Sequence, residues 1–153
     1  MNLLSPFSKR DLFTAAENAR IVEAIRAAEK RTSGEIRLFT ESRCRFVDPL
    51  DRAAEVFWGL KMDHTKYRNS VLVYVAVKDH QFAIFADKGI HEKLGNNFWK
   101  EEVAKMAIHF KENHYLEAIL LVINDVGAAL SEQFPFDPNT DKNELPDDIV
   151  FGK

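Results

Sequence analysis

One stretch of the sequence decides the fold, and it reads Arg68-Asn69-Ser70-Val71-Leu72-Val73-Tyr74-Val75-Ala76-Val77-Lys78-Asp79-His80-Gln81-Phe82-Ala83-Ile84-Phe85-Ala86-Asp87. Its first run, residues 71–77, is apolar throughout, as in a strand that is covered on both faces. Its second run, residues 81–87, alternates with the period of two that is typical of a strand. The polar residues 78–80 between the runs are too few for a crossover, so the two strands are predicted to pair as an antiparallel hairpin.

The residues before this hairpin predict a helix followed by a βαβ unit. The spacing of Thr14 and Glu17 is that of a capping box, although Asp11 or Ser8 could begin the helix earlier, and the helix is predicted to end at residues 32–34. Residues 35–41 alternate as a strand, and Asp48-Pro49 begins a second helix. The strand at 35–41 is therefore predicted to lie parallel to the strand at 71–77, with a right-handed crossover.

The residues after the hairpin predict more helix. A turn or short helix should reach Leu94, a break follows at residues 95–97, and residues 98–113 have a helical stripe. Residues 115–133 predict a last helix; residues 120–123 could instead be a short strand, but the length of the pattern favours helix. The predicted fold class is α/β, a three-layer-like sandwich in which about four helices cover a small mixed sheet, with one domain at residues 11–135. Residues 1–10 are predicted to be a flexible arm, and residues 136–153 an acidic, largely irregular tail.

Composition excludes several classes of protein. The net charge of the 153 residues is -3, which argues against a nucleic-acid partner, since proteins that bind the phosphate backbone are usually basic. A single cysteine, Cys44, excludes a disulfide within the chain. No segment resembles a signal peptide or approaches the roughly 20 apolar residues of a membrane span, so we expect a soluble, cytoplasmic protein with no membrane insertion.

The predicted topology brings four polar residues to one end of the sheet: Glu35, Arg68, Asn69 and Asp87. Carboxylates bind Ca²⁺ or Mg²⁺, and arginine binds phosphate through two hydrogen bonds, so this group could hold a hard cation or a phosphate. The alternative is that Arg68 and Asp87 form a structural ion pair and that Asn69 makes a turn.

The opposite end of the sheet is predicted to collect a second polar group, formed by Glu41, Ser42, Asp48, Asp79 and His80. Ligands of α/β sheets often lie at the carboxyl ends of parallel strands, and the start of a helix there could hold an anion. The simpler interpretation is that residues 79–80 form the hairpin turn and that Asp48 caps a helix.

Cysteine and histidine chemistry is not supported by spacing. Cys44 lies between two arginines that could stabilise a thiolate, but a cysteine phosphatase needs an arginine six positions later, where this chain has Leu50. We therefore interpret Cys44 as an incidental loop thiol. His109 and His114 are five positions apart, which does not place them on one helical face, and no zinc site is expected.

Several short motifs, taken in their order along the chain, resemble the TPM domain family. They are Gly34-Glu35-Ile36, Arg68-Asn69-Ser70-Val71-Leu72, Ala86-Asp87-Lys88-Gly89-Ile90, Phe98-Trp99 and Phe134-Pro135. This family is named for a thylakoid-lumen protein linked to photosystem II repair and an auxiliary protein of acetylcholine receptors, and the resemblance spans roughly residues 11–135. It implies an α/β sandwich with a small mixed sheet and, from the plant members, weak acid phosphatase activity and calcium binding.

This chain departs from that family pattern in three places. Many members carry a signal peptide, and many bacterial members end in a membrane helix or a glycine-rich tail; neither feature is found here. The arginine-asparagine pair is usually followed by glycine, whereas this chain has Ser70. The resemblance points to the arginine-asparagine pair and to Asp87 as the residues that matter.

Two functions remain open from the sequence. The favoured one is a non-enzymatic binding module that contacts a protein partner through this end of the sheet or through the acidic tail, because no nucleophile–base pair is evident. The alternative is a divalent-metal-assisted phosphomonoesterase acting on a phosphorylated small molecule. In that enzyme Asp87 and Glu35 would hold Ca²⁺ or Mg²⁺, while Arg68 and Asn69 would orient the phosphate.

Overall fold

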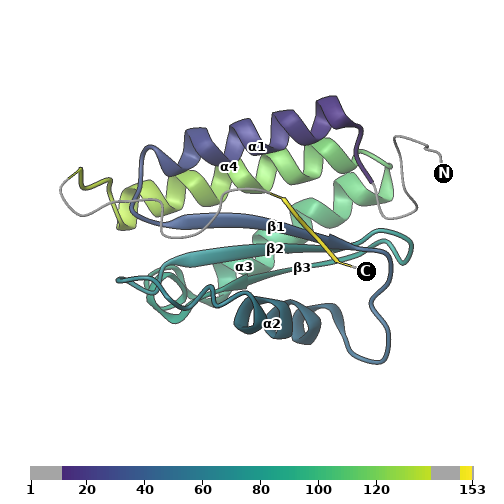
Figure 1. The fold of residues 1–153 in the computed structure, drawn as a ribbon, viewed down its shortest axis with the longest axis horizontal. Helices are drawn as coiled ribbons and strands as arrows, with labels where there is room; N and C mark the ends of the chain where they lie inside the picture. The colour runs from purple at the N-terminus through teal and green to yellow at the C-terminus, as the bar shows by residue number, and fades with distance from the viewer. Residues whose placement is uncertain (1–11, 139–148, 153) are drawn as a thin grey trace.

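The computed structural model describes residues 12–138 and 149–152, and Figure 1 shows its arrangement. The elements in chain order are α1 (Ala15–Glu29), β1 (Glu35–Glu41), α2 (Pro49–Gly59), β2 (Ser70–Ala76), β3 (Gln81–Ala86), α3 (Lys88–Lys111), α4 (Tyr115–Gln133) and β4 (Val150–Phe151). The arm predicted for residues 1–10, and most of the tail, lie outside the described residues.

The strands form a mixed sheet in the order β3-β2-β1-β4. β2 and β3 pair antiparallel, with Val71 opposite Ala86, so the predicted hairpin is confirmed. β1 and β2 pair parallel, with Glu35 opposite Ser70, which confirms the βαβ unit. The long apolar run of β2 is explained by its place inside the sheet, where every one of its residues is buried.

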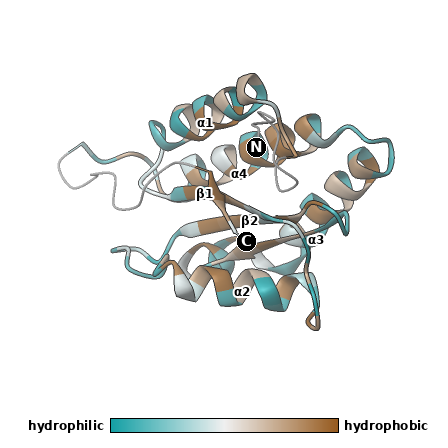
Figure 2. Cartoon of the chain, turned by 45° about the vertical axis from the view of Figure 1, so that its right-hand side comes forward, coloured by the Kyte–Doolittle hydropathy of each residue, from teal (hydrophilic) through white to brown (hydrophobic). Residues whose placement is uncertain are grey.

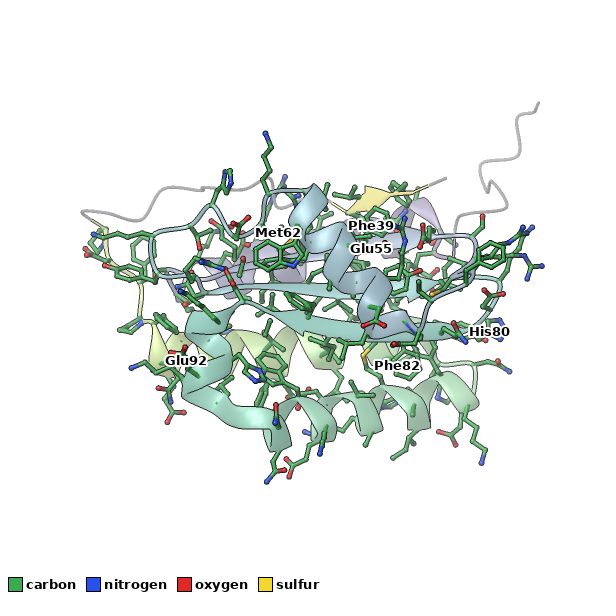
Figure 3. All side chains as sticks on the ribbon, turned by 90° about the horizontal axis from the view of Figure 1, so that it is seen from below. Phe39, Glu55, Met62, His80, Phe82 and Glu92 are labelled. Atoms are coloured by element: carbon green, nitrogen blue, oxygen red, sulfur yellow. The ribbon has the colours of Figure 1, made fainter. Side chains whose placement is uncertain are left out.

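Helices cover both faces of the sheet, as predicted. The larger core joins α1, α3 and α4 to one face, and a smaller core joins α2 to the other face. In Figure 2, where the ribbon is coloured by residue hydropathy, hydrophobic residues follow the strands, and Figure 3 shows α2 lying across the sheet when the molecule is viewed from that side. The buried residues include Phe57, Leu72, Val75, Trp99 and Ile123. Phe85 is partly buried and packs against the smaller core.

The helix boundaries follow from their capping residues. Thr14 and Glu17 form the predicted capping box at the start of α1. Asp48 caps α2 by accepting hydrogen bonds from the backbone N–H groups of residues 50 and 51, with Pro49 at the first helical position. The predicted break after Leu94 is a kink within α3, at Gly95, whose φ of 78° is one that glycine adopts without strain. Residues 115–133 form the predicted helix rather than a strand.

A short part of the C-terminal tail is a strand, which was not predicted from the sequence. β4 pairs parallel with β1, placing Val150 and Phe151 opposite Phe39 and Thr40. The Gly152 N–H also donates to the Thr40 carbonyl at 2.7 Å, and Ile149 is buried in the larger core. These contacts attach the end of the chain to the sheet. No helix in the described part of the chain is both long and apolar enough to cross a bilayer.

Candidate functional site

The four residues predicted as a site do lie at the same end of the sheet. The Glu35 N–H donates to the Asn69 carbonyl at 3.4 Å, and the Asp87 N–H donates to the Ser70 carbonyl at 2.9 Å. Glu35 therefore lies on one side of the start of β2, and Asp87 lies on the other side. The side chains are not equivalent, however, because Arg68 and Asp87 bind each other.

Arg68 and Asp87 form a two-pronged ion pair. The Arg68 Nε and Nη2 atoms donate to the two Asp87 carboxylate oxygens at 2.6 and 2.8 Å. The same carboxylate caps α3 by accepting from the Lys88 N–H at 2.8 Å. The Asp87 side chain is only 2% exposed, and its hydrogen bonds raise the pKa of Arg68 above the ordinary value. On the basis of this geometry the pair holds the start of α3 against the loop before β2.

The backbone at Arg68 has an unusual conformation and packs closely against the start of α3. Its φ of 53° lies in the left-handed region, which costs free energy for a residue with a side chain. Its carbonyl accepts from the Gly89 N–H at 2.8 Å. A Cβ atom at Gly89 would lie 2.1 Å from the Tyr67 carbonyl oxygen, so this approach requires glycine. Sequence reasoning missed the close approach, and its signal was the glycine two positions after Asp87.

Asn69 and Glu35 have separate surroundings. Asn69 is fully buried, and its Nδ2 donates to the Ser33 hydroxyl at 3.2 Å, while its Oδ1 has no hydrogen-bond partner among the residues that the structure describes. Glu35 is 4% exposed. Ca²⁺ takes six to eight oxygen ligands. No cluster of three acidic, histidine or cysteine side chains suited to a metal occurs among residues 12–138 and 149–152, and the Asp87 oxygens already bind Arg68. A cation at Asp87 would therefore have to displace Arg68 from the carboxylate.

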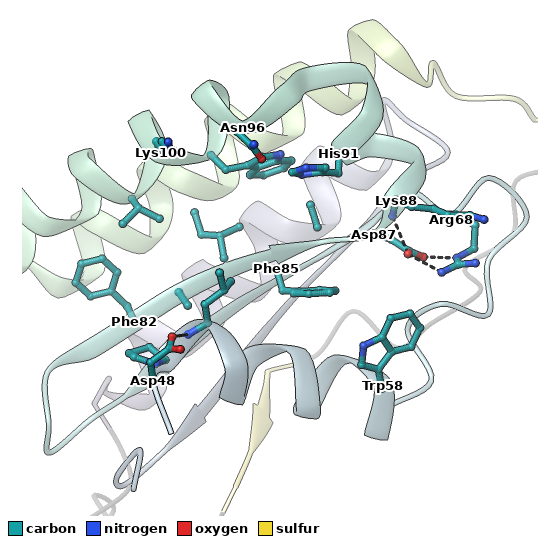
Figure 4. Close-up of a pocket in the computed structure, with 17 residues that line it drawn as sticks. Asp48, Trp58, Arg68, Phe82, Phe85, Asp87, Lys88, His91, Asn96 and Lys100 are labelled. Atoms are coloured by element: carbon teal, nitrogen blue, oxygen red, sulfur yellow. Dashed lines mark hydrogen bonds and ion pairs between the residues drawn. The ribbon is translucent and has the colours of Figure 1, made fainter. Parts of the chain in front are cut away.

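An apolar groove extends from this ion pair along the outer edge of β3, between α2 and α3. Its volume is about 860 Å³. Three parts of the chain line it. The α2 side contributes Asp48, Pro49, Leu50 and Trp58; the edge of the sheet contributes Arg68, residues 82–86 of β3 and Asp87; and α3 contributes Lys88, His91, Asn96, Trp99, Lys100 and Val103. Figure 4 shows the Arg68–Asp87 pair and Trp58 at one end of the groove, and Phe82 and Asp48 towards the other. Sequence reasoning did not predict this groove.

Charged groups occur at the rim of the groove rather than on its floor. Arg68 is satisfied by Asp87, and its guanidinium also lies 5.9 Å from the centre of the Trp58 ring. Asp48 is engaged as the cap of α2. Lys88 and Lys100 line the α3 side and have no ion-pair partner in the described structure. The uncompensated charge at the groove is therefore positive.

The opposite end of the sheet is held by other ion pairs. Arg52 donates to both Glu41 oxygens, at 2.8 and 2.9 Å, and the Tyr74 hydroxyl donates to the same carboxylate. Burial, together with this hydrogen bond, raises the pKa of Tyr74 strongly. Asp79 binds Arg43 at 2.8 Å and accepts from the Cys44 N–H. A smaller polar cavity of about 460 Å³ lies here, lined by residues that include Ser42.

The remaining residues predicted at this end have local roles. Asp48 is a helix cap, as the simpler interpretation held. His80 lies in the turn between β2 and β3, with a φ of 51°. The Cys44 thiol donates to the Val47 carbonyl at 3.3 Å.

Comparison with known proteins identifies the family. The model of the TPM domain matches residues 7–129. The NMR structure of BA42 protein from the psychrophilic bacterium Bizionia argentinensis is similar at a TM-score of 0.84 and 42% identity, covering 93% of this chain and 97% of that one. The N-terminal domain of cg2496 protein from Corynebacterium glutamicum shares the fold at a TM-score of 0.54 and 12% identity, over 84% of this chain and 86% of that one. No curated protein matches the chain. The family match covers most of the described fold, and this chain belongs to the TPM domain family.

Proposed function

We propose that this protein is a non-enzymatic binding module that takes an extended segment of a partner protein into the groove between α2 and α3. The observation that carries the proposal is the apolar lining of this groove beside β3, a sheet edge with which no strand of the described residues pairs. Two large apolar side chains of the α2 wall are about half exposed, Leu50 at 51% and Trp58 at 49%. Clustered exposed apolar surface of this kind marks an interaction site.

The shape of the groove favours a segment of protein over a compact small molecule. The groove follows β3 along its length, from Phe82 to Asp87 (Figure 4). An extended chain fills such a space with side chains while its backbone meets the strand edge. The unpaired Lys88 and Lys100 at the rim favour acidic groups on that segment.

The chemistry of the groove supports binding better than catalysis. The polar groups at its ends are engaged with one another, Arg68 with Asp87 and Asp48 with the start of α2. A hydrolase needs a nucleophile or a positioned water together with a base within hydrogen-bonding reach. Among the described residues that line the groove, no serine, threonine or cysteine is present to act as nucleophile.

The second function predicted from the sequence is the metal-assisted phosphomonoesterase at Asp87, Glu35, Arg68 and Asn69. It requires Arg68 to exchange Asp87 for a phosphate, and Asp87 to exchange Arg68 for a cation. The phosphatase prediction is tested by hydrolysis of p-nitrophenyl phosphate with millimolar Ca²⁺ or Mg²⁺, comparing wild type with Asp87→Asn. A cation that binds only the folded state also raises the melting temperature with its concentration.

The binding proposal is tested by selecting random nonapeptides on the full chain and mapping them with variants. Leu50→Glu places a charge on the α2 wall, yet it leaves the Asp48 cap intact because that bond uses the Leu50 backbone N–H. Selected peptides should bind Leu50→Glu at least about tenfold more weakly than wild type. The matched control is Ile108→Glu, since Ile108 is 62% exposed on α3 and does not line the groove. Equal binding to both variants, or the failure to select any peptide, would contradict the proposal.

A further inference from the structure

We infer that the bound segment adds a β-strand to the outer edge of β3, and that it carries acidic side chains towards α3. This inference rests on the proposed function and specifies how the groove is used. β3 is the end strand of the sheet, and no other strand in the described part of the chain pairs with its outer side. Its backbone groups on that side are therefore available to a partner chain.

The register with β2 determines which backbone groups of β3 face outwards. Asp87 lies opposite Ser70 in this register, and its N–H binds the Ser70 carbonyl at 2.9 Å. Opposite residues of an antiparallel pair alternate between those that exchange hydrogen bonds and those that do not. The residues whose N–H and C=O groups point away from β2 are therefore Phe82, Ile84 and Ala86.

The spacing of these groups sets the length of the segment. They occur at every second residue over a span of five, residues 82–86. At about 3.4 Å per residue, a strand that uses all of them needs roughly five to seven residues in contact with β3. Successive side chains of such a strand point to opposite faces of the sheet.

The two faces at this edge differ in chemistry. Side chains pointing to the α2 face meet Leu50 and Trp58, which are apolar and exposed. Side chains pointing to the α3 face meet Trp99 and Val103, and beyond them the unpaired ammonium groups of the α3 rim. A segment that alternates apolar side chains towards α2 with carboxylates towards α3 complements both walls.

Both lysines at the rim of the groove belong to α3. Lys88 lies at the start of this helix and Lys100 three turns further along, so they flank the groove at two points. Among the described residues that line the groove, both carboxylates are engaged, because Asp87 binds Arg68 and Asp48 caps α2. The favoured occupant is therefore an acidic extended segment rather than a basic one.

The test uses a synthetic probe, acetyl-Ser-Val-Glu-Val-Asp-Val-Glu-Val-Ser-amide, and the full chain. A peptide with lysine at each acidic position is the matched control. The acidic peptide should bind at least about tenfold more tightly than the lysine peptide at low salt. Amide signals of Phe82, Ile84 and Ala86 should be the most strongly perturbed in the NMR spectrum of the protein.

Methylation of single backbone nitrogens in the probe tests strand addition itself. An N-methyl group at a residue that bonds to β3 removes a donor, so affinity should fall about tenfold at every second position and stay unchanged between them. Lys100→Glu should weaken the acidic peptide and strengthen the lysine peptide, whereas Lys111→Glu, the same change outside the groove, should alter neither by more than about twofold.

The outcomes separate this inference from the proposed function. Binding in the groove without a period of two in the methylation series would overturn strand addition and leave the binding module intact. Equal affinity of both peptides would overturn the acidic preference. If sedimentation shows a dimer that competes with the probe, the occupant is a second copy and the inference is wrong. If neither probe nor any selected peptide binds, the proposed function fails with it.

Discussion

The two edges of the sheet differ in whether another strand of the described chain pairs with them. At the β1 edge the C-terminal residues return as β4, and Ile149 packs into the larger core. At the β3 edge no described strand follows, and the backbone faces an apolar groove between two helices. Proteins usually block unpaired edges because such edges bind other chains. One edge is paired within the chain, while no described strand pairs with the other edge, and the proposed partner strand is assigned to that open edge.

The walls also limit what can reach the open edge. α2 and α3 flank β3, so a flat sheet edge of another molecule meets the helices before it meets the strand (Figure 4). Substitutions in the α3 wall and at the end of the groove weaken the structure around the open edge, whereas truncation of the C-terminus removes the strand at the closed edge.

The largest effect is expected from Trp99→Ala, which removes part of the α3 wall. Trp99 is 8% exposed, belongs to the larger core and contacts the Phe98 ring edge-on at 4.8 Å. The loss should be about 3–5 kcal/mol of unfolding free energy in denaturant titration. Trp58→Ala on the opposite wall is the control, with a loss of about 1 kcal/mol, since this ring is 49% exposed. A loss below about 1 kcal/mol for Trp99→Ala would place its ring at the periphery.

The next effect is expected at the end of the groove. Asp87→Ala removes the cap of α3 and the partner of Arg68 together, and should destabilise the fold by about 2–4 kcal/mol. The cost stays below that of a fully buried pair because the Arg68 side chain is 30% exposed and can be hydrated. Thermal and urea unfolding measure it, with Asp51→Ala on the first turn of α2 as a control that should change stability little. If Asp87→Ala leaves stability unchanged, the ion pair is not a structural support.

A pH-dependent change in the free energy of unfolding is expected from Glu102, a buried residue of α3. Burial, with Asp125 of α4 adding to it, raises the pKa of Glu102 from 4.5 to about 7, and Lys105 opposes the shift. The native state therefore holds a proton that the unfolded state has already released, so stability should fall by roughly 2–3 kcal/mol as the pH rises from about 4.5 to 7.5.

Glu102→Gln tests the assignment of this pH dependence. The variant removes the titrating group, so that contribution should disappear and the protein should be more stable than wild type at pH 8. Urea unfolding at several pH values measures both effects. A wild-type slope that persists in Glu102→Gln would assign the pH dependence to other groups.

The smallest effect is expected at the closed edge. Deleting residues 149–153 exposes the β1 edge and the site of Ile149, and should cost about 1–2 kcal/mol, because one buried side chain and a two-residue pairing are lost. Peptide affinity at the β3 edge should not change. A truncation that abolishes binding at β3 would show that the two edges are not independent.

Most of the fold could be predicted from local patterns. The hairpin, the βαβ unit and the start of α2 depend on period, turn length and capping residues, all of which lie close together in the chain. β4 could not be predicted in this way, because its pairing joins residues 150–151 to a strand more than a hundred positions earlier. A two-residue strand has no periodicity of its own, and burial of Ile149 depends on the finished core.

The candidate site was predicted less completely. Strand polarity was enough to bring Arg68 and Asp87 to one end of the sheet, where the structural ion pair considered from the sequence is formed. The groove was missed because its walls come from α2 and α3, and their separation depends on how both helices pack on the sheet. Exposure of Leu50 and Trp58 is likewise a tertiary property, since an apolar residue on an amphipathic helix is normally expected in the core.

The most direct test of this account is residue-resolved amide hydrogen exchange along β3 in the free protein. An open edge predicts alternation, with the outward N–H groups of Phe82, Ile84 and Ala86 exchanging faster than those of Ala83 and Phe85, which bind β2. The Gly152 N–H, which binds Thr40 at the closed edge, should be protected. Uniformly slow exchange along β3 at a protein concentration where the chain is monomeric would show that this edge is already covered, and would contradict the account.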